Sequence, residues 1–194
     1  MTFTSVKIGE FDIKREAVLK PYFKTMNNKI AFGGGCHWCT EAVFQALKGV
    51  DKVEQGFIAS TKDHTTFSEA VIVHFNPEII TLDILIQIHL YTHKSTSNHS
   101  MRTKYRSAIY YFSEAQKKDT TLLLATLQSE FEATIITKTL PFKDFKPSEA
   151  QFKNYYKNNP NKPFCQTYIN PKLKLLQAKF SKHLTDNLQR KSIS

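Results

Sequence analysis

The chain has 194 residues, of which 41% are hydrophobic and 12% aromatic, with only 6 Gly and 7 Pro. This composition excludes collagen-like and low-complexity disordered chains, and the length is typical of one folded domain. The 27 basic and 17 acidic residues give a formal net charge of +10. Residues 1–150 carry 18 basic and 16 acidic side chains, whereas residues 151–194 carry 9 and 1. The excess charge therefore lies in the C-terminal segment, where a solvated surface explains it better than a nucleic-acid site.

In chain order, the sequence predicts an extension and then alternating strands and helices. Residues 1–28 mix charged and aromatic side chains and end in a turn-forming Asn pair, so we expect them to precede the core. Composition and periodicity then predict a strand at 29–32, a helix that follows Gly33-Gly34-Gly35 and ends at Gly49, strands at 53–59 and 69–75, a helix at 81–93, a strand at 107–112, a helix at 114–127, a strand at 132–140 and an amphipathic helix at 171–183. This order predicts an α+β fold, a two-layer sandwich with a mixed sheet and a split βαβ (ferredoxin-like) core.

Cysteine usage indicates the compartment. The three cysteines, Cys36, Cys39 and Cys165, are too few and odd in number for the disulfide scaffold of a small secreted domain. The first 20 residues have no apolar stretch of signal-peptide length, and no segment approaches the ~20 apolar residues of a membrane span. We therefore expect a soluble, cytoplasmic protein, a monomer without a membrane or nucleic-acid partner.

The cysteine pair behind the three glycines is the most informative feature. Cys36 stands at the predicted start of a helix, where unpaired N–H groups and the helix dipole favour a thiolate. Residues i and i+3 of a helical turn have Cα atoms roughly 5 Å apart, so Cys36 and Cys39 can form a reversible disulfide. Two plainer interpretations remain: a pair of buried, inert thiols, or a zinc site shared with two of His89, His93 and His99.

At this stretch the sequence resembles a known family. The run AFGGGCHWCTEAVF is similar to the signature of peptide methionine sulfoxide reductase A (MsrA), a glycine pair followed by Cys, Phe, Trp, a variable residue and, two positions further on, Glu. Cys36, Trp38 and Glu41 match this signature, and His37 takes the place of the Phe. Ser68-Glu69-Ala70-Val71 resembles the strand with the family's catalytic acid.

Two further segments extend the resemblance toward the C-terminus. Residues 103–107 (TKYRS) resemble the family segment Thr-Gln-Tyr-Arg-Ser, and Cys165 with residues 169–173 (INPKL) resembles the family's C-terminal region. The resemblance implies an MsrA-like catalytic domain at 29–175 and leaves 176–194 as a basic C-terminal helix or tail.

The resemblance also implies a reaction, that of a peptide-methionine (S)-S-oxide reductase with no metal and no bound cofactor. Cys36 would attack the sulfoxide sulfur, Glu69 would give a proton to the oxygen, and Tyr105 would hydrogen-bond that oxygen. Cys36 would become a sulfenic acid, and Cys39 would resolve it to a disulfide that thioredoxin reduces. Cys165 is the rival resolving residue, because some family members resolve with a C-terminal cysteine.

Several predicted substrate contacts depart from the family. Trp38 fits the apolar wall that holds the substrate's methyl group, but His37 makes that wall more polar. Phe57 stands where the family usually has a second Tyr, so one hydroxyl is missing, and Ser100 and Arg102 replace an acidic residue and a Gly. We expect a working reductase that is slow or altered in substrate preference. The alternative is a non-catalytic thiol redox sensor on the same fold.

Overall fold

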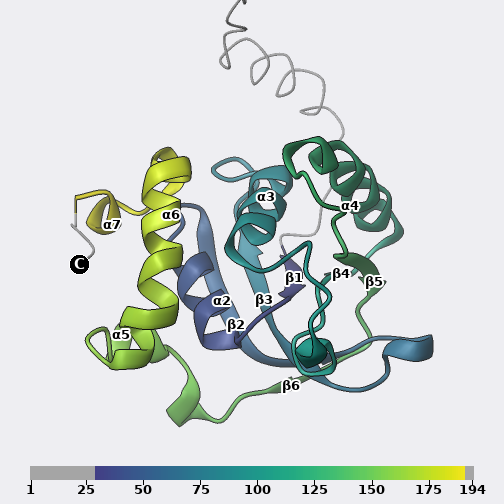
Figure 1. Ribbon diagram of the computed structural model, residues 1–194, viewed down its shortest axis with the longest axis horizontal. Helices are drawn as coiled ribbons and strands as arrows, with labels where there is room; N and C mark the ends of the chain where they lie inside the picture. Colours follow the sequence, from purple (N-terminus) through teal and green to yellow (C-terminus); the bar gives the residue numbers. More distant parts are fainter. Residues whose placement is uncertain (1–28, 191–194) are drawn as a thin grey trace, which may run out of the picture.

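A single six-stranded sheet organises the protein, whose computed structural model describes residues 29–190 (Figure 1). The predicted extension at 1–28 lies outside the described residues. The strands are β1 (Lys29–Gly33), β2 (Val50–Ala59), β3 (Ser68–Phe75), β4 (Ala108–Tyr111), β5 (Lys138–Pro141) and β6 (Asp144–Pro147). Their order in the sheet is β5-β4-β1-β3-β2-β6.

The four central strands form the predicted split βαβ core. β3 lies between β1 and β2 and is antiparallel to both, and β4 is antiparallel to β1. The helix α2 (His37–Gln45) connects β1 to β2, and α3 (Leu82–Thr92) connects β3 to β4. β5 is parallel to β4, which makes the sheet mixed. The predicted α+β class is therefore confirmed.

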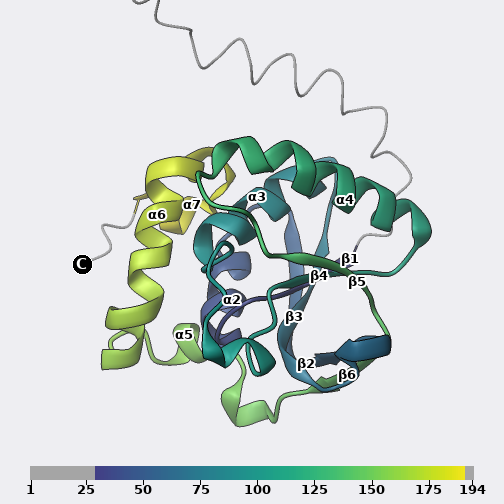
Figure 2. The same ribbon diagram turned by 45° about the vertical axis from the view of Figure 1, so that its right-hand side comes forward.

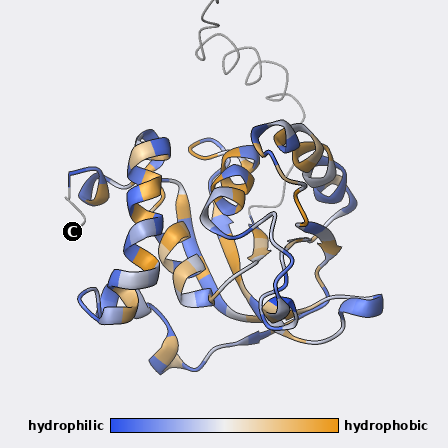
Figure 3. Cartoon of the chain, viewed as in Figure 1, coloured by the Kyte–Doolittle hydropathy of each residue, from blue (hydrophilic) through white to orange (hydrophobic). Residues whose placement is uncertain are grey.

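The helices share one face of the sheet. α6 (Asn170–Phe180), α2, α3 and α4 (Glu114–Leu127) lie side by side across it, as the two views in Figures 1 and 2 show. Alternate strand residues, Ile30 and Phe32 among them, pack with the apolar faces of these helices in one large buried cluster. Figure 3 shows hydrophobic residues on α2, α3 and α6. The opposite face of the sheet carries a smaller cluster around Ala31 and Tyr110.

The predicted strand at 132–140 is mostly wrong. A 3-10 turn, Gln128–Glu130, ends α4, and regular pairing begins only at Lys138. The Gln128 side chain bonds the backbone of Phe131, Ala133 and Ile135, which fixes this segment as a loop. The edge strand β6 was not predicted, because a four-residue strand that ends in proline has little sequence signal.

The C-terminal region is more helical than the sequence indicates. It adds α5 (Tyr155–Asn158), a π-helical turn at Cys165–Ile169, a 3-10 turn at Ser181–His183 and α7 (Asp186–Arg190). The helix predicted at 171–183 is α6 and the 3-10 turn after it. α6 crosses the domain boundary placed after residue 175, because Leu176 and Phe180 are buried in the main cluster. Within residues 29–190, no helix is long and apolar enough to span a bilayer.

Candidate active site

The glycines between β1 and α2 allow close approach of neighbouring groups. A Cβ added to Gly34 would lie 2.4 Å from the His93 ring, and one added to Gly33 would lie 2.8 Å from the Arg106 carbonyl oxygen. Within the described chain the only glycine with positive φ is Gly49, so the glycine run does not depend on left-handed backbone angles. The run instead lets the end of β1 pack against His93 and the loop before β4.

Cys36 is the N-cap residue of α2, and Cys39 follows one turn later. The hydrogen bond from the Cys39 thiol lowers the pKa of Cys36, although burial and the negative charge of Glu69 oppose it. The N–H groups of Trp38 and Cys39 at the helix start lower it further. The same hydrogen bond, with burial, raises the pKa of Cys39. The pair therefore consists of a thiolate-forming Cys36 and a protonated Cys39 that points at it.

Glu69 is buried at the start of β3, next to the thiol pair. Its Oε2 accepts a hydrogen bond of 3.0 Å from the His37 backbone N–H, and its Oε1 lies 3.4 Å from Nζ of Lys104. The His37 ring Nδ1 is 3.8 Å from Oε2 and 3.1 Å from the Gly56 carbonyl oxygen. Because the start of α2 supplies a donor to Glu69, the predicted nucleophile and the predicted acid share one local framework.

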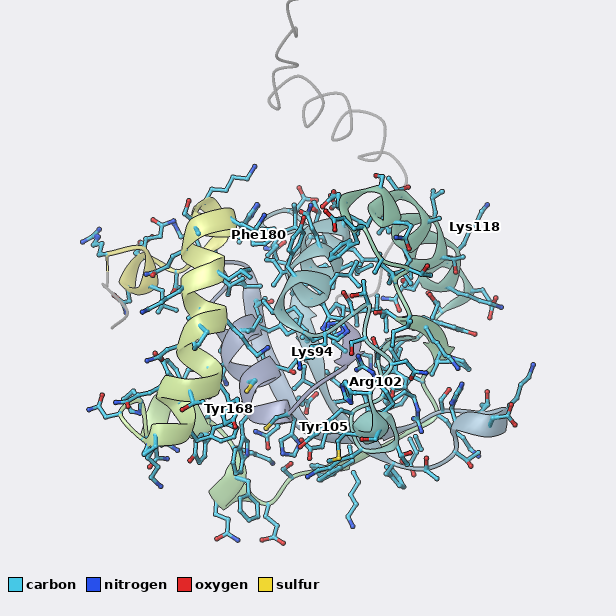
Figure 4. The ribbon with its side chains drawn as sticks, in the orientation of Figure 1. Lys94, Arg102, Tyr105, Lys118, Tyr168 and Phe180 are labelled. Atoms are coloured by element: carbon cyan, nitrogen blue, oxygen red, sulfur yellow. The ribbon has the colours of Figure 1, made fainter. Side chains whose placement is uncertain are left out.

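A cavity of about 570 Å³ opens over the thiol pair. Its lining residues come from the start of α2, the end of α3, the loop before β4 and the π-helical turn: they include Cys36, Cys39, His93, Lys94, Tyr105, Phe164, Tyr168 and Lys172. Tyr105 and Tyr168 lie on opposite sides of the start of α2 in Figure 4. The cavity thus brings the predicted nucleophile together with Tyr105, and most of its lining surface is apolar.

Phe57 and His37 face the acid rather than the main cavity. Phe57 on β2 is the direct cross-strand neighbour of Glu69 on β3. The His37 ring meets the Phe57 ring edge-on, with centroids 5.2 Å apart. The side chain at position 57 is therefore close enough to Glu69 for its missing hydroxyl to matter.

Trp38 belongs to an aromatic cluster. Its ring stacks on Tyr155 with centroids 4.2 Å apart and meets Phe164 edge-on at 5.3 Å. Buried Glu41 supports this stack: it accepts hydrogen bonds from the backbone N–H groups of Asn154 and Tyr155. Burial raises the pKa of this carboxyl group despite those bonds. One face of the Trp38 ring is therefore covered by the stacked ring of Tyr155.

Cys165 occupies a different environment from the other two cysteines. It is fully buried at the start of the π-helical turn, where its Sγ lies 3.1 Å from the Asn159 carbonyl oxygen. Burial raises the pKa of its thiol. Cys36, in contrast, is partly exposed and lines the cavity.

Two of the three histidines weighed as zinc ligands, His89 and His93, have other partners. His89 Nε2 hydrogen-bonds to the Gly33 carbonyl oxygen. In His93, Nδ1 hydrogen-bonds to the His89 carbonyl oxygen and Nε2 to Ser107 Oγ. Burial lowers the pKa of His93 to about 3, so its ring is neutral. Between residues 29 and 190, no three His, Cys, Asp or Glu side chains gather where a metal ion would bind.

Sequence patterns did not single out Lys104, Tyr155, Phe164, Tyr168 or Lys172, all of which border the site. Lys172 is partly buried beside the thiol pair, donates a hydrogen bond to the Thr92 carbonyl oxygen and has its pKa lowered by desolvation. The available signal was the aromatic and proline-rich composition of 152–168, which indicates loops that carry functional residues. Chemically, the site places a nucleophilic thiol and a second thiol at a mostly apolar cavity, with the Glu69 carboxyl group buried beside the start of the same helix.

Comparison with known proteins agrees with this chemistry. Residues 28–184 match the family model described as peptide methionine sulfoxide reductase. The chain is 36% identical to "Peptide methionine sulfoxide reductase MsrA" of Acinetobacter baumannii over 170 residues, 80% of this chain and 97% of that protein. The protein of the same name from Deinococcus radiodurans is 36% identical over 174 residues, 81% of this chain and 82% of its own.

Solved structures give the same result. The reduced form of Mxr1 from Saccharomyces cerevisiae superposes with a TM-score of 0.64 at 26% identity, covering 72% of this chain and 90% of Mxr1. Mxr1 in complex with Trx2 superposes with a TM-score of 0.53 at 25% identity, covering 66% of this chain and 90% of Mxr1.

Proposed function

Because the chain belongs to the peptide methionine sulfoxide reductase family, it is a thiol-dependent reductase of methionine sulfoxide, and we propose that Cys36 is its nucleophile. The observation that carries this assignment is the position of Cys36 at the N-cap of α2 and the edge of the cavity, where the Cys39 thiol and two backbone N–H groups lower its pKa. A thiolate is the reactive form of cysteine. Cys36 therefore has both the ionisation and the access that attack on a sulfoxide requires.

The remaining roles follow from position. Glu69 supplies the proton and Tyr105 a hydrogen bond to the sulfoxide oxygen. The Cys36 thiolate, one proton and the sulfoxide give methionine and a Cys36 sulfenic acid, so the oxygen passes from one sulfur to the other. Trp38, His37 and Phe57 form the wall around the substrate's methyl group and the acid. The short distance from Glu69 to the backbone N–H of His37 supports this arrangement.

We assign resolution to Cys39. Its thiol already hydrogen-bonds to Cys36, so formation of the Cys36–Cys39 disulfide with loss of water needs little movement. Cys165, whose thiol is buried against Asn159, would have to leave its packing first. Peptide mapping after one turnover tests this: a 36–39 crosslink is expected, and a 36–165 crosslink as the first product contradicts it.

Thioredoxin is the reductant we propose for this disulfide. The support is the similarity to Mxr1, which was solved in complex with Trx2. The low and odd number of cysteines supports a reducing compartment such as the cytoplasm. Oxidised proteins and free methionine sulfoxide are both candidate substrates of the open cavity.

The test is a turnover assay with dithiothreitol and a methionine sulfoxide substrate. Wild-type protein is expected to form many methionines per enzyme, whereas Cys36→Ser forms none above background. Equal background turnover in both proteins contradicts the assignment and favours the non-catalytic redox sensor. Folding of the variant is checked by its thermal unfolding midpoint.

A further inference from the structure

Lys104 places a positive charge between the two groups assigned to the sulfoxide oxygen. Its Nζ lies 3.4 Å from Glu69 Oε1 and 5.1 Å from the centroid of the Tyr105 ring. A sulfoxide oxygen within hydrogen-bond reach of both Glu69 and Tyr105 therefore lies beside this ammonium group. In the family segment that residues 103–107 resemble, this position holds a neutral Gln.

The backbone of Lys104 is fixed to the strand that carries the acid. Its carbonyl oxygen accepts the Glu69 backbone N–H at 3.0 Å and the Ser68 hydroxyl at 2.9 Å. The Ser68 hydroxyl oxygen in turn accepts the Arg106 backbone N–H at 2.8 Å. These bonds hold the root of the Lys104 side chain next to Glu69, although the side chain itself is 56% exposed. The amine is thus tethered near the acid while remaining open to a substrate.

Lys104 keeps its charge at neutral pH. The hydrogen bond to Tyr105 and the charge of Glu69 raise the pKa of the Lys104 amine. An ammonium group donates up to three hydrogen bonds, so the contacts to Glu69 and Tyr105 leave one donor for a ligand.

Two hydrogen-bond donors of His37 near Glu69 already have partners. The His37 backbone N–H binds Glu69, and the His37 ring nitrogen Nδ1 faces the Gly56 carbonyl oxygen. Phe57, the cross-strand neighbour of Glu69, has no hydroxyl to offer. Lys104 is therefore placed to supply the donor that the phenylalanine at position 57 cannot.

We propose that the Lys104 ammonium group donates a hydrogen bond to the substrate's sulfoxide oxygen, in place of the hydroxyl absent at Phe57. This inference rests on the proposed function of the site. When the Cys36 thiolate bonds to the substrate sulfur, negative charge grows on the oxygen, and the ammonium stabilises it. Glu69 then gives a proton to the oxygen, which moves from the substrate sulfur to the Cys36 sulfur: the bond between the two sulfurs and the substrate S–O bond break, the Cys36 S–OH bond forms, and methionine leaves. Lys104 retains its own protons throughout.

The test compares Lys104→Met with Lys118→Met, which removes the same charge from α4, far from the site (Figure 4). The readouts are kcat/KM for sulfoxide reduction and the rate at which iodoacetamide alkylates Cys36. Loss of a hydrogen-bond donor that acts in the transition state lowers kcat/KM by ~10²-fold. We expect that loss in Lys104→Met, unchanged alkylation of Cys36, and full activity in Lys118→Met.

A rescue experiment separates a substrate contact from a structural role. Phe57→Tyr adds the missing hydroxyl, so it is expected to raise kcat/KM of Lys104→Met about tenfold or more while changing the wild type less than about threefold. The proposal is overturned if Lys104→Met stays within about threefold of wild type, if Phe57→Tyr gives no rescue, or if Cys36 alkylation slows in parallel. Wild-type protein no more active than Cys36→Ser would instead reject the proposed function itself.

Discussion

Two parts of the site are built from different elements: the thiol side, around Cys36 and Cys39, and the acid side, around Glu69. At the start of α2, backbone N–H groups, a second thiol and the helix dipole act on Cys36. At the edge of β2 and β3, Glu69 is held by one backbone N–H and by the side chain of Lys104, with His37 and Phe57 beside it. The thiol side depends on main-chain geometry, whereas the acid side depends on the identity of a few side chains.

Several departures from the family resemblance lie on the acid side. The thiol side needs a glycine run and a helix start, and both are kept. On the acid side, β3 fixes the position of Glu69 but not the side chains around it. One hydrogen-bond donor near the carboxyl group can therefore be replaced by another. The departures at His37, Phe57 and Lys104 fall within reach of that carboxyl group, whereas the Arg102 guanidinium donates to the Gly34 carbonyl oxygen on the thiol side.

The largest effect is expected from Glu69→Gln, which keeps an oxygen for the His37 N–H but removes the acid. Loss of a general acid lowers rates by about 10²–10⁴-fold, so kcat/KM for sulfoxide reduction should fall by that factor. Cys36 alkylation should persist, and its pH midpoint should move downward, because the charge of Glu69 raises the pKa of Cys36. The matched control is Glu54→Gln, which should keep full activity. Glu54 lies on β2, where its carboxylate pairs with Lys52 and with His74 of β3. Equal activity of the Glu69 and Glu54 variants would remove the acid from the mechanism.

Cys39→Ala tests the thiol side and its pH dependence. The Cys39 hydrogen bond lowers the pKa of Cys36, so its removal should raise that pKa and move the pH midpoint of Cys36 alkylation upward. At a fixed pH below the midpoint, alkylation should become slower because less thiolate is present. Turnover with thioredoxin should also stop, because the sulfenic acid has no resolving thiol.

Cys165→Ala is the control for that experiment. Its thiol is buried against Asn159, so the alkylation midpoint of Cys36 should not move. Continued turnover with thioredoxin in Cys39→Ala but not in Cys165→Ala would transfer the resolving role to Cys165.

The sequence predicts the thiol side better than the acid side, for a physical reason. Cys36, Cys39 and the glycines are consecutive in the chain, so helix-start geometry alone places them together. The central strands and α2, α3, α4 and α6 are likewise predicted from local periodicity. The ion pair between Glu69 and Lys104 joins residues 35 positions apart, and the Trp38–Tyr155 stack joins residues 117 positions apart. Such contacts depend on the tertiary fold, and no local pattern indicates them.

The smallest effect is expected on stability, from Gly34→Ala with Gly35→Ala as its matched control. A Cβ at Gly34 would lie 2.4 Å from the His93 ring, whereas nothing lies within 4 Å of one at Gly35. The His93 ring cannot turn away freely, because both of its nitrogens are hydrogen-bonded. Overpacking of this kind costs ~1–3 kcal/mol of unfolding free energy, whereas substitutions into open space stay within ~0.5 kcal/mol. Urea denaturation of both variants measures the difference, and equal midpoints would show that main-chain packing does not hold the thiol side in place.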